Sequence, residues 1–244
     1  MTAVLRKIKK RSVSFILWSI GLGLFIPFGL FIIVYSLFFD PRRIDPFLKA
    51  GCRFILNAML IRTEVSGLQH VDAEKTVVFM ANHVNVFDAL VLFGYIPNYA
   101  RGVELDKHFK WPLWGLLLKR LGQIPISRDG GKKALQSLET ARQRIENGTS
   151  IIILPEGTRT LTGEPGTFKR GPFILVKAAK TDIVPVVMID AFQIKHKGSS
   201  IITPGTIKVK FGKPVRYSDI KHLHTRDILK VVEGKIRELF ESDY

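Results

Sequence analysis

The chain opens with a long uncharged apolar segment and continues with shorter apolar runs that alternate with polar ones. Residues 12–39 contain no charged side chain, and clusters of Lys and Arg stand on both sides of them. As one helix these 28 residues would be about 42 Å long, compared with about 30 Å for the hydrocarbon core of a bilayer. We therefore expect this segment to be embedded in a membrane. A cleavable signal peptide is disfavoured, because the segment is too long and no small-residue cleavage site follows it.

Two membrane arrangements fit this segment. The first is a single tilted crossing, and the second is a bent segment, broken at the glycines and the proline of residues 21–29, that enters and leaves by the same face. A true crossing gathers its basic residues on one side, so basic flanks on both sides favour the bent arrangement. Residues 46–61 mix Lys49 and Arg53 with large apolar side chains and predict an amphipathic helix in the membrane interface. A core helix of the following domain is the alternative.

From residue 61 onward, short apolar β-branched runs alternate with longer segments of helical periodicity. The predicted strands are residues 76–80, 122–126, 150–154, 183–189 and 207–211. The predicted helices are residues 87–93, 111–121, 132–147, 173–180 and 225–241. This alternation predicts an α/β fold with a largely parallel central sheet flanked by helices. We expect an N-terminal membrane-embedded helical segment over residues 1–60 and the α/β domain over residues 61–244.

The charge balance limits the kind of partner. The chain carries 37 Lys and Arg against 21 Asp and Glu, a formal net charge of +16. Such an excess indicates an anionic partner: nucleic acid, anionic lipid headgroups, or a phosphorylated or CoA-like substrate. The single cysteine, Cys52, excludes a disulfide framework and a cysteine-based zinc site, and we expect it to be a small buried apolar residue. We expect His222 and His224 to be solvated.

A histidine and an aspartate follow the first predicted strand in the stretch "ANHVNVFDAL", as His83 and Asp88. A neutral imidazole accepts a proton at physiological pH, and a carboxylate bonded to its other nitrogen fixes the tautomer. The chain has no Gly-x-Ser-x-Gly nucleophile motif, and its one cysteine lies near the membrane segment. This favours a general base in a direct transfer, without a covalent enzyme intermediate. The alternative is that Asp88 only caps a helix while His83 is an ordinary loop residue.

A second polar cluster, residues 155–159 (PEGTR), follows the predicted strand 150–154. In parallel sheets, sites gather at the carboxyl ends of strands. The guanidinium of Arg159 suits a phosphate, and turn amides near it can add donors. An ordinary surface ion pair between Glu156 and Arg159 is the alternative. Further basic elements are Arg128 in GQIPISRD and Lys169-Arg170 in GTFKRG.

Five blocks follow one another along the chain. They are Asn82-His83-x4-Asp88, Gly122–Arg128 (GQIPISR), Pro155–Arg159 (PEGTR), Phe168–Gly171 (FKRG) and Ile183–Val187 (IVPVV). In this order and spacing they resemble the glycerolipid acyltransferases of the lysophosphatidic acid acyltransferase (1-acyl-sn-glycerol-3-phosphate acyltransferase) family. The resemblance covers about residues 60–215, and the basic, apolar N-terminal segment also suits it.

The resemblance implies a role for each matching residue. His83 would be the general base, and Asp88 would orient its ring. Arg159 would bind the phosphate of the acyl acceptor, with Arg128 as a helper. Glu156 would shape that loop or position the acceptor. The other residues implied in acceptor binding are Asn82, Gly157, Thr158 and Lys169, and those implied in lining the acyl side are Val184 and Pro185.

The resemblance also implies the reaction. A fatty acyl chain would pass from acyl-CoA or acyl carrier protein to the sn-2 hydroxyl of 1-acyl-glycerol-3-phosphate, giving phosphatidic acid. No metal and no cofactor is expected, the partners would be membrane lipids rather than nucleic acid, and the site would face the cytoplasmic side of the inner (plasma) membrane. Two alternatives stay open: an acyltransferase for another lysophospholipid or a lyso-aminolipid, and a non-catalytic basic protein that binds membrane surfaces.

The chain departs from this family at one block. Many members carry a Lys-Lys-Glu-Leu-like sequence between the first two motifs, whereas this chain has Arg101-Gly-Val-Glu-Leu105. One cation on the phosphate side is thus missing or replaced, and Arg101 and Lys107 are the replacements that the sequence offers.

Overall fold

The computed structural model describes residues 3–127 and 131–242, so Arg128 lies outside the described residues. The strands within these ranges are β1 (Ile61–Ser66), β2 (Val78–Ala81), β3 (Ala100–Leu105), β4 (Ile124–Ile126), β5 (Ser150–Ile153), β6 (Ile183–Ile189) and β7 (Gly205–Phe211). The α-helices are α1 (Ala3–Phe38), α2 (Asp45–Ala58), α3 (Asp88–Tyr95), α4 (Trp114–Arg120), α5 (Gly131–Glu146), α6 (Gly171–Ala179), α7 (Ala191–Ile194), α8 (Tyr217–Ile220) and α9 (Thr225–Glu241).

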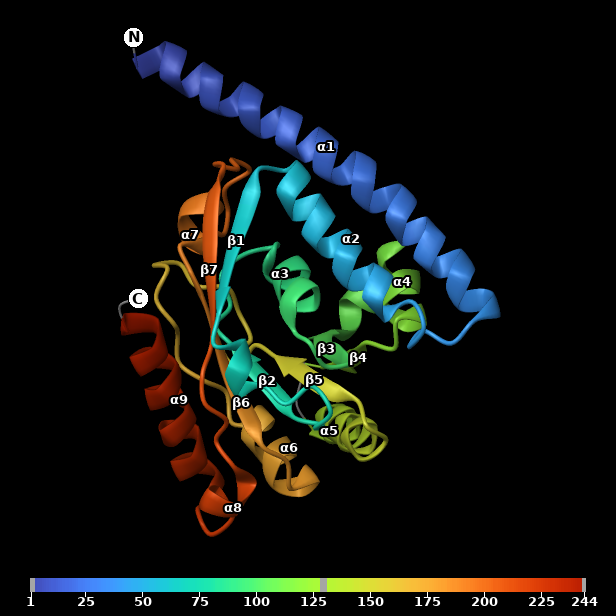
Figure 1. Cartoon of the computed structure of the whole chain (residues 1–244), viewed down its shortest axis with the longest axis vertical. Coiled ribbons are helices and arrows are strands. Elements are labelled where there is room, and N and C mark those ends of the chain that lie inside the picture. The colour runs from blue at the N-terminus through green and yellow to red at the C-terminus, as the bar shows by residue number, and fades with distance from the viewer. Residues whose placement is uncertain (1–2, 128–130, 243–244) are drawn as a thin grey trace.

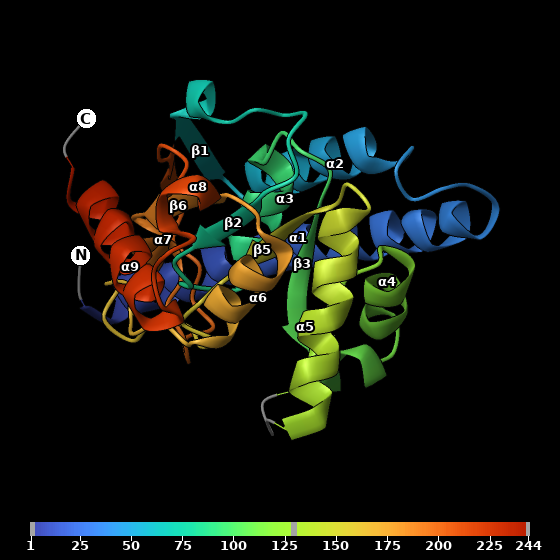
Figure 2. The ribbon, with the colours of Figure 1, turned by 90° about the horizontal axis from the view of Figure 1, so that it is seen from below.

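The strands form one sheet in the order β1-β7-β6-β2-β5-β3-β4. The five strands from β6 to β4 are parallel to one another, whereas β7 is antiparallel to β6 and β1 is parallel to β7. Helices α2 and α3 cover one face of the sheet, and α5, α6 and α9 cover the other (Figures 1 and 2). The predicted α/β fold with a largely parallel sheet is confirmed.

The central strands are buried on both faces, which explains why they read as continuous apolar runs. In β2, Val78 and Met80 belong to the core under α5, α6 and α9, while Phe79 and Ala81 belong to the core under α2 and α3. Such a strand ends abruptly where polar residues begin. The loops that follow β2, β5 and β6 therefore emerge together at one edge of the sheet.

Two strands escaped prediction because polar side chains interrupt them. In β1 the buried Ile61 is followed by alternating exposed and half-buried residues, as expected of an edge strand. In β3 the apolar pattern is broken by Arg101 and Glu104.

Helix α1 is continuous over its 36 residues, with Pro27 inside it, so the predicted break between residues 21 and 29 is wrong. Gly21, within this region, serves close packing instead. A Cβ on Gly21 would lie 2.5 Å from the sulfur of Met59, and a Cβ on Gly51 of α2 would overlap the ring of Phe28. Figure 1 shows α1 lying diagonally across the molecule beside α2 and α4.

By length and composition, residues 7–38 of α1 suffice to cross a membrane: their most apolar window has a mean hydropathy of 2.3, and 28% of it is buried against the protein. Helix α2 is amphipathic, as predicted. Its Leu48, Cys52, Ile55 and Leu56 are buried, whereas Phe47 and Phe54 are exposed. Because Ile55 and Leu56 join the same core as β2 and β6, α2 packs as part of the α/β body. The domain boundary at residue 60 stays a prediction.

A buried ion pair fastens α2 to β3. The guanidinium of Arg101 is 1% exposed and lies 3.0 Å from Asp45 Oδ1, and the other carboxylate oxygen of Asp45 lies 2.9 Å from Lys49 Nζ. The same guanidinium stacks on the Tyr99 ring, 4.0 Å from its centroid. Arg101 is therefore not free to bind a substrate phosphate, which corrects the expectation that it replaces the missing lysine.

Asp45→Ala is expected to lower the free energy of unfolding by about 3–5 kcal/mol, because it leaves the Arg101 guanidinium buried without its partner. Urea unfolding in detergent micelles measures this. The matched control is Asp72→Ala, which removes an exposed aspartate paired with Lys75 at 3.7 Å and is expected to change stability by less than about 0.5 kcal/mol. Equal losses in the two variants would contradict a special role for the buried pair.

Candidate active site

The loop after β2 holds His83 and Asp88 in direct contact. Asp88 Oδ2 lies 2.7 Å from His83 Nδ1. An ionised carboxylate only accepts hydrogen bonds, so Nδ1 carries the proton and Nε2 has a free lone pair. The His83 side chain is 24% exposed and that of Asp88 only 2%, so the ring reaches solvent while its partner does not.

Asp88 also organises the loop itself. It stands in the first turn of α3 and accepts hydrogen bonds from the amides of Val84 (2.7 Å) and Asn85 (3.0 Å). Both amides precede α3, and the N-terminus of the helix has no side-chain cap, so the helix-capping alternative is wrong and Asp88 is the partner of His83 and of its loop. The carboxylate is fixed by the backbone before it fixes the ring.

Two asparagines clamp this loop to the end of β6. The side-chain amide of Asn82 donates to the Met188 carbonyl (3.1 Å) and accepts from the Met188 amide (2.8 Å). Asn82 is 1% exposed, so its predicted contact with substrate is corrected to a contact within the protein. Asn85, which sequence reasoning missed, donates to the carbonyl of Ala191 at 2.7 Å. Both asparagines lie within the first motif, but only the fold reveals their partners.

The loop after β5 binds the backbone of His83 from both sides. Glu156 Oε1 accepts from the His83 amide at 2.8 Å, and the amide of Thr160 donates to the His83 carbonyl at 2.8 Å. Glu156 is 3% exposed and also accepts from the Gly166 amide. Burial raises the pKa of Glu156, and the two amide hydrogen bonds oppose that rise. Glu156 thus shapes the loop and does not form the alternative surface ion pair with Arg159.

Arg159 lies on this loop, beside a cleft of about 310 Å³. Arg159 and most of the residues from 156 to 167 line the cleft, together with Lys197, whose Nζ is bonded to Thr158 Oγ1 at 3.1 Å. His83 does not line the cleft. Thr160, however, lines the cleft, and its amide donates to the His83 carbonyl.

Gly157 and Lys169 complete the loop. Gly157 has φ of +64°, a left-handed conformation that favours glycine. The amide of Lys169 donates to the Pro155 carbonyl at 2.7 Å, and its exposed side chain runs beside Gly157. The predicted residues Glu156, Gly157, Thr158, Arg159 and Lys169 therefore belong to one folded loop next to His83.

Other predicted residues lie elsewhere. Val184 and Pro185 are in the middle of β6 and buried, with Val184 packed among core side chains at 1% exposure. Both side chains are buried within the protein, so the predicted contact with an acyl chain has no support from their position. Lys107 is exposed in the turn after β3.

Two lysines near Arg159 were missed by sequence reasoning. Lys195 and Lys197 follow α7, at the carboxyl end of β6. The rule that sites gather at strand ends, applied to residues 183–189, points to this Lys-His-Lys stretch. Burial lowers the pKa of Lys195, and the charge of Arg159 lowers it further.

The profile of the family described as Acyltransferase matches residues 62–189, more than half of the chain. The chain belongs to the acyltransferase family. The matched range contains both halves of the site just described, namely the His83–Asp88 pair and the loop of Arg159.

This acyltransferase is similar to curated proteins named 1-acyl-sn-glycerol-3-phosphate acyltransferase, as the motifs predicted. The chloroplastic LPAT1 of Arabidopsis thaliana is 24% identical over 204 residues, covering 82% of this chain and 57% of the relative. The Pseudomonas aeruginosa protein is 31% identical over 153 residues, covering 62% and 58%. The chain spans about half the length of the curated relatives it matches.

A crystal structure of the 1-acyl-sn-glycerophosphate acyltransferase PlsC from Thermotoga maritima has the same fold. Its TM-score to this acyltransferase is 0.83, with 19% sequence identity, over 96% of this chain and 95% of that one. The likeness extends beyond the matched family range and thus includes most of the N-terminal helices.

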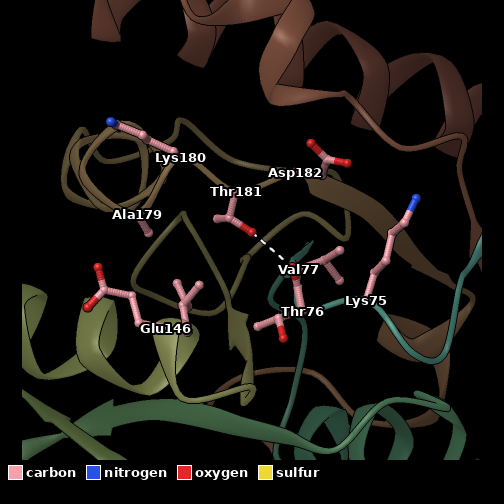
Figure 3. Close-up of a pocket in the computed structure, with 9 residues that line it drawn as sticks. Lys75, Thr76, Val77, Glu146, Ala179, Lys180, Thr181 and Asp182 are labelled. Atoms are coloured by element: carbon pink, nitrogen blue, oxygen red, sulfur yellow. Dashed lines mark hydrogen bonds between the residues drawn. The ribbon is translucent and has the colours of Figure 1, made fainter.

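A second cleft in this acyltransferase lies at the opposite edge of the sheet (Figure 3). It is lined by residues that precede β2, β5 and β6, among them Thr76, Thr181 and Asp182. The Thr181 hydroxyl is bonded to the Thr76 carbonyl at 3.1 Å, and the side chains of Lys75 and Lys180 extend away from each other. The cleft contains no histidine and lies far from the loops that carry the His83 pair.

Glu156→Ala is expected to lower the free energy of unfolding by about 1–3 kcal/mol, because the amides of His83 and Gly166 lose their buried acceptor. Acyl transfer is expected to fall about 10²-fold, since the loop no longer fixes Arg159 relative to the ring. Chemical unfolding and steady-state kinetics measure the two effects. Glu74→Ala, which removes an exposed carboxylate from the loop before β2, outside the cleft beside Arg159, is the matched control and should change neither. If Glu156→Ala retained normal kinetics, Glu156 would not be needed to hold the site together.

Proposed function

We propose that this acyltransferase moves a fatty acyl group from an acyl thioester to the sn-2 hydroxyl of 1-acyl-glycerol-3-phosphate, which yields phosphatidic acid. One observation carries the proposal: the loop bearing Arg159 is bonded to both sides of the His83 peptide, whose ring is paired with Asp88. A proton acceptor and a phosphate-binding group are thus held as one unit. The names of the similar curated proteins support this choice of substrate.

The chemistry follows from the pairing of His83 with Asp88. Nε2 takes the proton of the acceptor hydroxyl while that oxygen attacks the thioester carbonyl, and Asp88 stabilises the imidazolium that forms. The tetrahedral intermediate then collapses, the carbon–sulfur bond breaks, and the thiolate takes the proton from the imidazolium. No covalent enzyme intermediate, metal or cofactor is needed in this scheme, and the acyl-CoA or acyl carrier protein is a co-substrate.

Charge supports the binding of both substrates. The guanidinium of Arg159 binds the phosphate of the acceptor, with the loop around Gly157 and Thr158 beside it. Acyl-CoA and acyl carrier protein are both acidic, and the net charge of +16 favours encounter with either.

The packing of α1 supports attachment to one leaflet, and we propose that this leaflet is at the cytoplasmic face. The Ser14 hydroxyl and the Trp18 indole both donate to the Ser200 carbonyl, at 3.0 and 2.8 Å. Ile33, about 28 Å further along the helix, is buried against α4 beside Leu117. A helix held to the protein over this length cannot stand across the bilayer without drawing the α/β body into the hydrocarbon. It therefore lies in the plane of the membrane.

The apolar surface is distributed as this orientation requires. Exposed large apolar side chains on α1 include Phe15, Ile16, Ile26, Phe31, Val34 and Phe38, and α2 adds Phe47 and Phe54. These residues enter one leaflet, so that a lysolipid reaches His83 with its own chain still in the bilayer.

An acceptor panel tests the proposed reaction. Purified protein in mixed micelles with an acyl thioester is expected to release thiol when 1-acyl-glycerol-3-phosphate is added, and to form phosphatidic acid. Greater release with another lysophospholipid or a lyso-aminolipid would indicate that acceptor instead. No acceptor-dependent release would favour the non-catalytic membrane-binding alternative.

His83→Ala is expected to lower kcat about 10²- to 10⁴-fold, because the general base is lost. The matched control is His108→Ala, since His108 Nδ1 lies at the same 2.7 Å from a carboxylate, that of Glu104, but outside the His83 loop. Initial rates of thiol release measure both variants, and circular dichroism checks the fold. A folded His83→Ala protein with near-normal kcat would exclude the base role.

The in-plane orientation of α1 predicts that both ends of the protein lie on one side of the membrane. In a Cys52→Ala background, single cysteines at Lys9 and Lys235, both exposed, are expected to react with a membrane-impermeant maleimide from the same side of sealed vesicles. Labelling from opposite sides would instead show that α1 crosses the bilayer.

A further inference from the structure

The segment that follows β6 carries a lysine into the neighbourhood of Arg159. Lys195 comes directly after α7, and its amide donates to the Ala191 carbonyl at 3.2 Å. That same carbonyl accepts the side-chain amide of Asn85, at 2.7 Å. One carbonyl therefore ties the backbone of Lys195 to the loop of the His83 pair.

Lys195 is buried without a counter-ion. It is 7% exposed, and its ammonium lies 6.0 Å from the ring centroid of Trp18 on α1. Throughout residues 3–127 and 131–242, no carboxylate stands within ion-pair distance of Lys195 or Arg159. Burial of an ammonium is unfavourable unless an anion compensates it. A structural lysine in the core would be expected to have such a partner.

The neighbouring cations make the buried charge of Lys195 still less favourable while no anion is bound beside it. Arg159 and Lys195 repel each other, and this repulsion is one reason why the pKa of Lys195 lies below its ordinary value, after burial itself. Lys197 adds a third cation beside Thr158. A phosphate monoester carries about −1.5 to −2 charges at neutral pH and would relieve the repulsion by binding between these groups.

The block Arg101–Leu105 itself provides no free cation. Gly102 and Val103 stand where the double lysine is expected, and Arg101 is bound to Asp45. A second phosphate ligand beside Arg159 therefore lies outside the Arg101–Leu105 block.

We propose that Lys195 is the second cation of the acceptor-phosphate site, binding the phosphate beside Arg159 while Trp18 of α1 holds its ammonium near the membrane surface. This inference rests on the proposed acylation of 1-acyl-glycerol-3-phosphate. It also gives α1 a role beyond anchoring, because the membrane helix contacts a residue that binds the headgroup.

Lys195→Met keeps the length of the side chain and removes its charge. With 1-acyl-glycerol-3-phosphate in mixed micelles, its KM for the acceptor is expected to rise about tenfold or more, which corresponds to the loss of one charged contact. Its kcat and its KM for the acyl thioester are expected to change by less than about threefold. Lys195→Arg, which restores the charge, should recover most of the loss.

The matched control is Lys221→Met, which removes an exposed lysine after α8, at the far end of the molecule from α7 (Figure 1). It is expected to leave both KM values unchanged. Thermal unfolding of each variant checks the fold, and Lys195→Gln serves as the second neutral variant if Lys195→Met is unstable.

Two results would overturn the inference. One is an unchanged acceptor KM in the folded neutral variants. The other is an equal rise in the KM values of acceptor and thioester that Lys195→Arg does not reverse, which would indicate a purely structural lysine. Failure of the proposed function is recognised separately, because the wild-type protein itself would then release no thiol in response to 1-acyl-glycerol-3-phosphate.

Discussion

The hydrogen bonds on both sides of the His83 peptide are the interaction on which the site depends. Glu156 accepts from its amide and Thr160 donates to its carbonyl, so two loops separated by more than 70 residues behave as one. Without this connection, Asp88 would still orient the ring, but Arg159 would have no fixed position relative to it. Catalysis by positioning needs both groups on one rigid frame, and the ends of β2 and β5 supply it.

A series of hydrogen bonds connects the His83 loop to α1 through the end of β6 and the segment that follows it. Asn82 and Asn85 fasten the His83 loop to Met188 and Ala191, and the segment beyond them reaches Ser200, which is bonded to α1. Helix α1, the lysines that follow α7 and the His83–Asp88 pair are thus linked by successive short contacts. This arrangement suits the proposed lysolipid acceptor, which would keep its chain in the bilayer while its alcohol and its phosphate meet the protein at one depth.

The sequence revealed the parts of this arrangement that depend on local pattern. Buried parallel strands read as apolar runs, so the positions of His83 and Arg159 at strand ends could be predicted. The remainder depends on distant partners. In the sequence Arg101 stands as a free cation, and only the fold places Asp45, 56 residues away, against it. The glycines of α1 suggested a break in the helix, but Gly21 instead packs against Met59. A role for Lys195 could be inferred only once the fold had placed it near Trp18 and Arg159.

The most direct measurement is a crystal structure of the protein with a non-reactive analogue of 1-acyl-glycerol-3-phosphate. The geometry predicts the phosphate within hydrogen-bond distance of the Arg159 guanidinium, and the sn-2 oxygen within about 3.2 Å of His83 Nε2. A phosphate bound away from Arg159, with the sn-2 oxygen out of reach of the ring, would contradict the claim that one acceptor bridges the two groups.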